Sequence, residues 1–159
     1  MNMTDLPTEL GLLTNLEQFI VDATSLGETG GTIPTELGNC QAMKTLRIAG
    51  KHFVGSLPTE LGRLTNMWEM EISGGTITGP VPSEIGLLTD MRSLSIMNNR
   101  IEGTLPSELG NIHTLDFFYL FSNDYLTGSI PSGMCESPSI RIDRDCSIVE
   151  CECCYLPCK

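Results

Sequence analysis

The stretch GTIPTELG, residues 31–38, decides the fold because near-copies of its second half recur along the whole chain. The copies are LPTELG at 6–11, IPTELG at 33–38, LPTELG at 57–62, VPSEIG at 81–86, LPSELG at 105–110 and a degenerate IPSGMC at 130–135. Their prolines are Pro7, Pro34, Pro58, Pro82, Pro106 and Pro131. The sequence therefore predicts a repeat of about 24 residues, with insertions near 26–30 and 124–126.

Between the copies, apolar residues recur as L-x-x-L-x-L, which ends in the alternation of a short strand with one buried face. The triplets are Leu16, Phe19 and Val21; Met43, Leu46 and Ile48; Met67, Met70 and Ile72; Met91, Leu94 and Ile96; Leu115, Phe118 and Leu120; and a truncated Ile140 and Ile142. A unit this short buries its apolar face only against copies of itself. We therefore predict a solenoid whose coils lie about 4.8 Å apart, with the strands aligned in one parallel sheet.

The stretch LSIMNNRIEGTLP at 94–106, with Met91 before it, resembles the plant-type, extracellular leucine-rich repeat. The LPTELG phrases and the cysteine-rich end are similar to algal secreted and receptor-like leucine-rich-repeat proteins. The resemblance covers residues 6 to about 145. It implies an α/β solenoid, a right-handed superhelix of about five full coils and a partial sixth. One parallel sheet would form the concave face, with short second strands and 3-10 or helical turns on the convex side.

The recurring phrase carries structural roles. Proline fixes φ and removes an N–H that would otherwise need a partner. The hydroxyls that follow it are expected to cap the next turn. They belong to Thr35, Thr59, Ser83 and Ser107. A glutamate column lies near the start of each turn, where negative charge is favoured. It consists of Glu9, Glu36, Glu60, Glu84 and Glu108, with a cation-binding stripe as the alternative.

The resemblance also implies a column of inward-facing asparagines that bond to the backbone of neighbouring coils. Here the column reads Thr24, Lys51, Gly75, Asn99, Asn123 and Asp145. Burying an unpaired Lys51 is costly, so we expect its side chain to bend out to solvent. The N-terminal half should be the less regular half. The usual N-terminal cysteine cap is missing, so the apolar edge of the first coil should be open unless residues 1–10 cover it or more chain precedes it.

The seven cysteines divide into one and six. Cys40 stands in a column of leucine and isoleucine, so we predict a buried core thiol. The other six are Cys135, Cys146, Cys151, Cys153, Cys154 and Cys158. Such a dense, even set predicts a disulfide-locked cap over 135–159, after a solenoid over 1–134, with 15 possible pairings.

The predicted disulfides imply an extracellular or cell-surface protein. The chain nevertheless opens MNMTDLPTEL, without the basic and apolar regions of a signal peptide. We therefore expect that a signal peptide has been removed or that the chain is a fragment of a larger protein.

Charge narrows the choice of partner. The chain has 20 acidic and 9 basic residues, a net charge of −11, whereas phosphate binding needs clustered Lys and Arg. Basic peptides, cationic polymers or divalent ions are the electrostatically easier partners. No apolar run approaches the roughly 18 residues that a membrane-spanning helix needs, so no membrane span is predicted.

No catalytic motif stands out in the sequence. His52 and His113 lie in turn segments of different coils and are predicted to be solvated. CECC, residues 151–154, lacks paired C-x-x-C spacing and a nearby histidine, which favours disulfides over zinc. We predict no enzyme, no cofactor and no metal.

The candidate site is the concave face, where the repeats differ. Alternation places three aromatic side chains of one strand outward together, and exposed aromatics mark contact surfaces. The predicted binding residues are Trp68, Glu69, Glu71, Ser93, Ser95, Met97, Phe117, Tyr119 and Phe121. We predict a non-enzymatic, monomeric module that binds a peptide, a protein or a glycan here. Alternatively, the cysteine-rich cap or neighbouring parts of a longer protein cover the aromatic patch.

A second hypothesis concerns hydroxyl columns outside the concave face. One consists of Thr32, Ser56, Thr104 and Ser129, broken by Pro80. The other consists of Thr35, Thr59, Ser83, Ser107 and Ser132. Regular hydroxyls one coil apart resemble ice-binding solenoids, and an adhesive or structural spacer is the third option.

Overall fold

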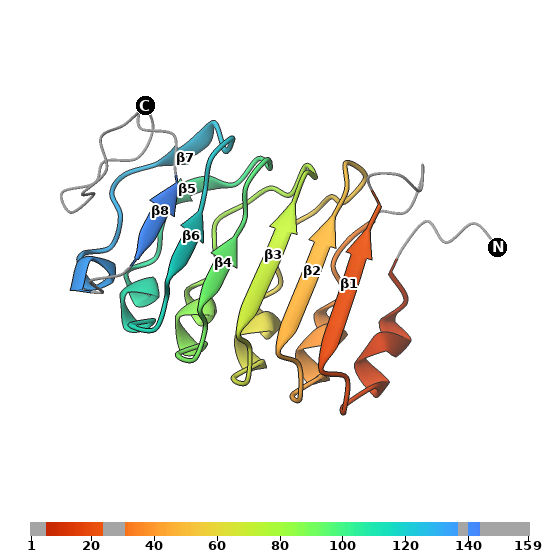
Figure 1. The fold of residues 1–159 in the computed structure, drawn as a ribbon. Helices are drawn as coiled ribbons and strands as arrows, with labels where there is room; N and C mark the ends of the chain where they lie inside the picture. The colour runs from red at the N-terminus through yellow and green to blue at the C-terminus, as the bar shows by residue number, and fades with distance from the viewer. Residues whose placement is uncertain (1–5, 24–30, 137–139, 144–159) are drawn as a thin grey trace.

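The computed structural model describes residues 6–23, 31–136 and 140–143, and its main feature is one parallel sheet along the side of a stack of coils (Figure 1). The sheet strands are β1 (Gln18–Asp22), β2 (Thr45–Ala49), β3 (Glu69–Ser73), β4 (Ser93–Ser95), β6 (Phe117–Tyr119) and β8 (Arg141–Asp143). They lie in chain order, β1-β2-β3-β4-β6-β8. This confirms the predicted solenoid and its single concave sheet.

The sheet register follows the sequence repeat. Glu69 of β3 pairs with Ser93 of β4, which in turn pairs with Phe117 of β6, one repeat further along the chain each time. β1 and β2 pair in the same way, from Gln18 to Thr45, across the longer first spacing. The insertion near 26–30 therefore leaves the strand register intact, and each sequence column becomes a row of neighbouring side chains across the sheet.

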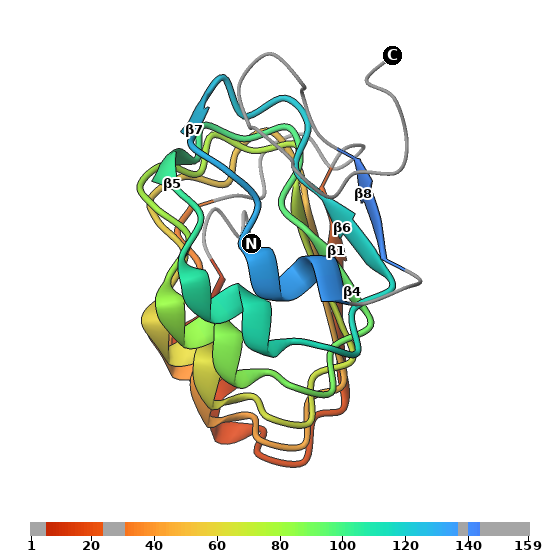
Figure 2. The same cartoon turned by 90° about the vertical axis from the view of Figure 1, so that its left-hand side faces the viewer.

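The far side of each coil carries a short 3-10 turn. The turns are η1 (Thr8–Leu12), η2 (Thr35–Asn39), η3 (Thr59–Arg63), η4 (Ser83–Leu87), η5 (Ser107–Asn111) and η6 (Ser132–Glu136). Short second strands, β5 (Glu102–Thr104) and β7 (Tyr125–Thr127), pair in parallel on a third side of the coils (Figure 2). Nearer the N-terminus this side has only isolated bridges in the described structure, such as the one between Ser56 and Thr78.

The predicted hydroxyl caps of these turns are wrong. Thr35 Oγ1 donates to Glu36 Oε2 at 3.2 Å, and no side chain caps η2. The same hydroxyl-to-glutamate bond recurs at Thr8, Thr59, Ser83 and Ser107. The reason is positional: proline occupies the N-cap in η1 to η5 and has no side-chain acceptor, so the hydroxyl falls inside the turn.

The repeat triplets form one continuous core, with Leu46, Met70, Leu94 and Phe118 all at most 1% exposed. The two asparagines of the consensus column are buried beside this core, as predicted. Asn123 Nδ2 donates to the carbonyls of Ile96 and Leu120 at 2.9 and 2.7 Å, and its Oδ1 accepts the Ile101 N–H at 3.1 Å. Each asparagine therefore ties its own coil to the preceding ones.

Lys51 is exposed, as predicted, but the expectation of a less regular N-terminal half is wrong for the sheet. The strands β1, β2 and β3 are all longer than β4 and β6. Asn99 offers a reason, because its Nδ2 donates to the carbonyls of Ile96 and Met97 just beyond β4. The Asn99 side chain thus occupies backbone carbonyls at positions where the longer N-terminal strands are still paired with their neighbours.

Cys40 is fully buried, as predicted, and its Sγ donates to the Leu10 carbonyl at 3.3 Å. The other cysteines lie outside the described residues, apart from Cys135, whose backbone belongs to η6. Of the predicted cap over 135–159 the structure describes only 135–136 and 140–143, and β8 within it is the last strand of the sheet. Among the residues that the structure describes, no helix is long and apolar enough to cross a membrane.

Burial raises the pKa of the Cys40 thiol, so less of it is the reactive thiolate at neutral pH. We expect iodoacetamide at pH 8 to leave Cys40 unmodified in the native protein and to alkylate it fully after denaturation. Peptide mass mapping with and without guanidinium measures this. Equal labelling of Cys40 in both states would contradict its place in the core.

Candidate ligand-binding face

A pocket opens at the end of the concave sheet where the strands begin. Its volume is about 410 Å³, and it spans three consecutive coils. We call it the aromatic pocket; it is lined by Trp68, Glu69, Arg92, Ser93, Asp116 and Phe117. The sheet register explains the shape, since small Ser93 lies between Glu69 and Phe117. The pocket thus has a low floor on β4 and taller walls on the coils either side.

The pocket's walls are aromatic and open to solvent. Trp68 is 59% exposed and Phe117 36% exposed. Phe117 stacks on Tyr119 with ring centroids 6.1 Å apart and an angle of 11° between the planes. The guanidinium of Arg141 lies 5.8 Å from the Phe117 centroid. Stacking on one side and a cation on another hold the Phe117 ring in place, so this wall is preorganised.

Among the described residues, ion pairs between neighbouring coils order the charges of the concave face. Lys44 pairs with Glu17 at 2.9 Å, and Arg92 with Asp116 at 3.6 Å. Arg47 pairs with Glu71 at 2.9 Å. Glu71 also accepts a hydrogen bond from Ser73 Oγ at 2.9 Å, and its side chain is 17% exposed. Glu71 was predicted to meet a ligand, yet both its oxygens are already engaged within the sheet.

The half-buried Glu69 differs from its neighbours. In the described part of the chain, its carboxylate has neither an ion pair nor a hydrogen bond, whereas Asp116, on the opposite wall of the pocket, is paired with Arg92. The pocket's three charged side chains leave one net negative charge. Its chemistry is therefore that of an aromatic slot with one uncompensated carboxylate.

The structure gathers part of the predicted site and separates the rest. Four predicted residues line the pocket: Trp68, Glu69, Ser93 and Phe117. Glu71, Ser95 and Tyr119 form the next row along the strands. Met97 and Phe121 lie beyond the ends of β4 and β6 and are half-buried.

Two pocket residues, Arg92 and Asp116, were missed. Arg92 and Asp116 stand one and two repeats after Trp68 and so belong to the same column of the repeat. Because Trp68 was a predicted binding residue, its column could have indicated both of them.

The prediction that Ser95 is exposed is wrong. It is 5% exposed, and its Oγ is buried without a hydrogen-bond partner in the described structure. Its short side chain lies in a row between the longer Glu71 and Tyr119.

The prediction that His52 is solvated is also wrong. The residue is half-buried, and its Nε2 is buried and unpartnered among the described residues. His113 is exposed, as predicted.

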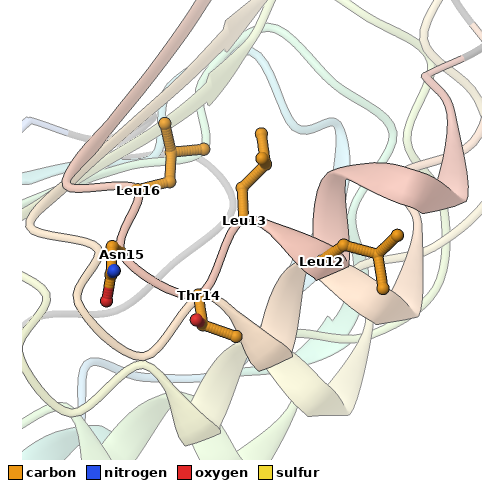
Figure 3. A pocket seen from close by; sticks show the side chains of 5 residues that line it. All are labelled: Leu12, Leu13, Thr14, Asn15 and Leu16. Carbon is orange, nitrogen blue, oxygen red and sulfur yellow. The ribbon is translucent and has the colours of Figure 1, made fainter.

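A second pocket marks the N-terminal edge of the stack (Figure 3). It has a volume of about 400 Å³, and the described residues that line it are 12–16. The side chains of Leu13 and Leu16 point to one side of this segment, and those of Thr14 and Asn15 to the other. Leu12 and Leu13 are 78% and 49% exposed. In the described structure the apolar edge of the first coil is therefore open.

The hydroxyl columns are less regular in space than in sequence. Ser56 pairs with Thr78 and Thr104 with Thr127, so the side of the coils that carries β5 and β7 is out of step with the sequence repeat. Thr78 and Thr127 belong to neither column, and their hydroxyls donate to the carbonyls of Gly55 and Gly103. In the second column, from Thr35 to Ser107, each hydroxyl donates to a glutamate.

Among the described residues, no group of three or more His, Cys, Asp or Glu could hold a metal ion.

Comparison with known proteins agrees with this architecture. A family model described as Leucine Rich Repeat matches residues 90–112. No curated protein sequence matches the chain significantly.

Among solved structures, the chain is similar to the plant peptide hormone receptor RGFR1 in complex with RGF2, at 29% identity and a TM-score of 0.81, over 87% of this chain and 22% of that one. It is also similar to PEPR1–AtPEP1, at 28% identity and a TM-score of 0.80, over 87% of this chain and 19% of that one. A plant ice-binding protein matches at 26% identity and a TM-score of 0.67, over 80% of this chain and 39% of that one. The chain thus spans about a fifth of the length of the two receptors.

Proposed function

We propose that this chain, a leucine-rich-repeat solenoid of the plant extracellular type, is a non-enzymatic recognition module that binds a peptide or protein on its concave face. The observation that carries the proposal is the aromatic pocket, where Trp68 and Phe117 stand exposed over the sheet. In characterised protein interfaces a few aromatic side chains contribute most of the binding energy, and ligand sites are typically concave and lined by such residues. A glycan is the second ligand class that such a face suits.

The concave face also suits recognition because its backbone is rigid. Continuous strand pairing from β1 to β8 fixes the positions of the outward side chains, and the buried triplets hold the strands from behind. A peptide ligand is supported by the similar structures, one of which is a plant peptide hormone receptor in complex with RGF2. We also propose an extracellular location, with residues 135–159 as a disulfide-locked cap after the solenoid, on the strength of the six cysteines clustered there.

The test is a binding panel of secreted peptides, secreted proteins and glycans. We expect a ligand retained by the wild-type chain to be lost, by about a hundredfold in affinity, in the triple variant Phe117→Ala, Tyr119→Ala, Phe121→Ala. Tyr125→Ala is the matched control, because Tyr125 is a 63% exposed aromatic on β7, outside the concave face. Circular dichroism must first establish that all variants fold.

Ligands that bind the triple variant and the wild type equally would contradict the proposal. A second candidate function would then gain weight, namely ice binding through the hydroxyl columns, which the similarity to a plant ice-binding protein favours. The irregular spacing of the first column and the glutamate-bound hydroxyls of the second count against it. Thermal hysteresis that disappears in Thr32→Val, Ser56→Ala, Thr104→Val would establish ice binding in place of peptide recognition.

A further inference from the structure

We infer that the aromatic pocket takes one arginine side chain of a peptide partner, an inference that rests on the proposed function and assigns the ligand chemistry of its site. The first step is shape. Trp68 and Phe117 stand on coils two strand spacings apart, about 10 Å. Ser93, the small pocket residue on the coil between theirs, leaves the space that a flat, extended side chain needs.

The second step is charge. The ion pairs of the concave face use the carboxylates of Glu17, Glu71 and Asp116, and none of those in the described structure uses Glu69. Glu69 is half-buried in the pocket, so part of the cost of withdrawing its charge from water is already present in the unbound protein. A single cation entering the pocket offsets that cost and balances the pocket's net charge of −1.

The third step selects among cations. An indole face is the strongest side-chain partner for a cation–π contact, and Trp68 presents its ring to solvent. A planar guanidinium stacks on such a ring and still donates two parallel hydrogen bonds to a carboxylate. The compact lysine ammonium is more strongly hydrated and makes only a point contact. The pocket therefore prefers arginine to lysine.

The fourth step concerns Arg92, which lines the same pocket and would repel a free cation. Its guanidinium is 3.6 Å from Asp116, and this pairing turns its charge toward the Phe117 side. The entering guanidinium would thus lie on the Trp68 and Glu69 side. The chain's net charge of −11 further favours the approach of a basic peptide.

The chain provides its own reporter, because Trp68 is its one tryptophan. The probe is the tripeptide acetyl-Gly-Arg-Gly-amide, titrated into the full chain while Trp68 emission is recorded. We expect a saturable change with a dissociation constant in the millimolar range, about 4 kcal/mol of binding. The lysine analogue should bind several-fold more weakly, and the neutral citrulline analogue about tenfold more weakly.

Glu69→Gln should weaken binding of the arginine peptide about tenfold. The matched control is Glu102→Gln, which also changes the net charge from −11 to −10 but lies exposed on β5, away from the concave face. If both variants weaken binding equally, the loss comes from the lower net negative charge of the chain and not from a contact with Glu69, and the inference is overturned. Equal binding of the citrulline peptide, or no saturable change up to about 20 mM of the arginine peptide, would overturn it as well.

The two proposals fail separately. A panel ligand lost by the aromatic triple variant but unaffected by Glu69→Gln overturns the arginine pocket and leaves the recognition module standing. If no panel ligand depends on the aromatic residues, the proposed function itself fails.

Discussion

Replacing Asn123 with alanine is expected to lower the free energy of unfolding by about 4 kcal/mol, because two backbone groups in the core lose their partners. The Ile101 N–H and the Leu120 carbonyl both bond to the Asn123 side chain, and an alanine offers neither an acceptor nor a donor. The Ile96 carbonyl is less affected, since Asn99 also donates to it. Asn123 is only 2% exposed, so water does not readily replace what is lost.

Denaturant titration followed by circular dichroism measures this effect. Asn111→Ala is the matched control, since Asn111 is an exposed asparagine at the end of η5 and should change stability by no more than about 0.5 kcal/mol. A loss at Asn123 no greater than at Asn111 would mean that the asparagine column does not tie the coils together.

The fold could be predicted almost completely from sequence because its information is periodic. The steps between Pro34, Pro58, Pro82 and Pro106 gave the coil length, and the apolar triplets gave the strands and the buried face. Stacking equivalent residues then needs no further information. Where a repeat departs from the pattern, prediction was weaker. Gly75 replaces the asparagine, and the Phe53 N–H, whose counterparts at Ile77 and Ile101 donate to asparagine side chains, donates to the Gly50 carbonyl instead.

The site could be predicted only in part, because the sequence gives the column of a residue but not the reach of its side chain. Ser95 and Glu71 both occupy outward positions, yet one is covered and the other is locked to Arg47. Which carboxylate stays unpaired depends on such contacts between coils. Glu69 therefore could not be distinguished from Glu71 before the structure was known.

The close stacking of the 3-10 turns leads to the last prediction, Gly86→Ala. A Cβ at Gly86 would lie 2.5 Å from the Glu108 carbonyl carbon and 2.7 Å from its Cβ, so the neighbouring turn would have to move. We expect a loss of about 3 kcal/mol, the upper end of what overpacking costs, because the obstructing atoms are mainly backbone. Gly103→Ala is the control: nothing lies within 4 Å, and only its positive φ of 78° opposes the change, at about 1 kcal/mol.

The location of the damage is more informative than its size. A solenoid is held together by contacts between adjacent coils, so a clash at one interface weakens the coupling across it and leaves the coils on either side intact. Hydrogen exchange in Gly86→Ala should therefore show faster exchange in β6, beyond the disturbed interface between η4 and η5, while β2 keeps its protection. Uniform loss of protection from β2 to β6 would show instead that the stack unfolds as a single cooperative unit, and the independent-coil description of this chain would be wrong.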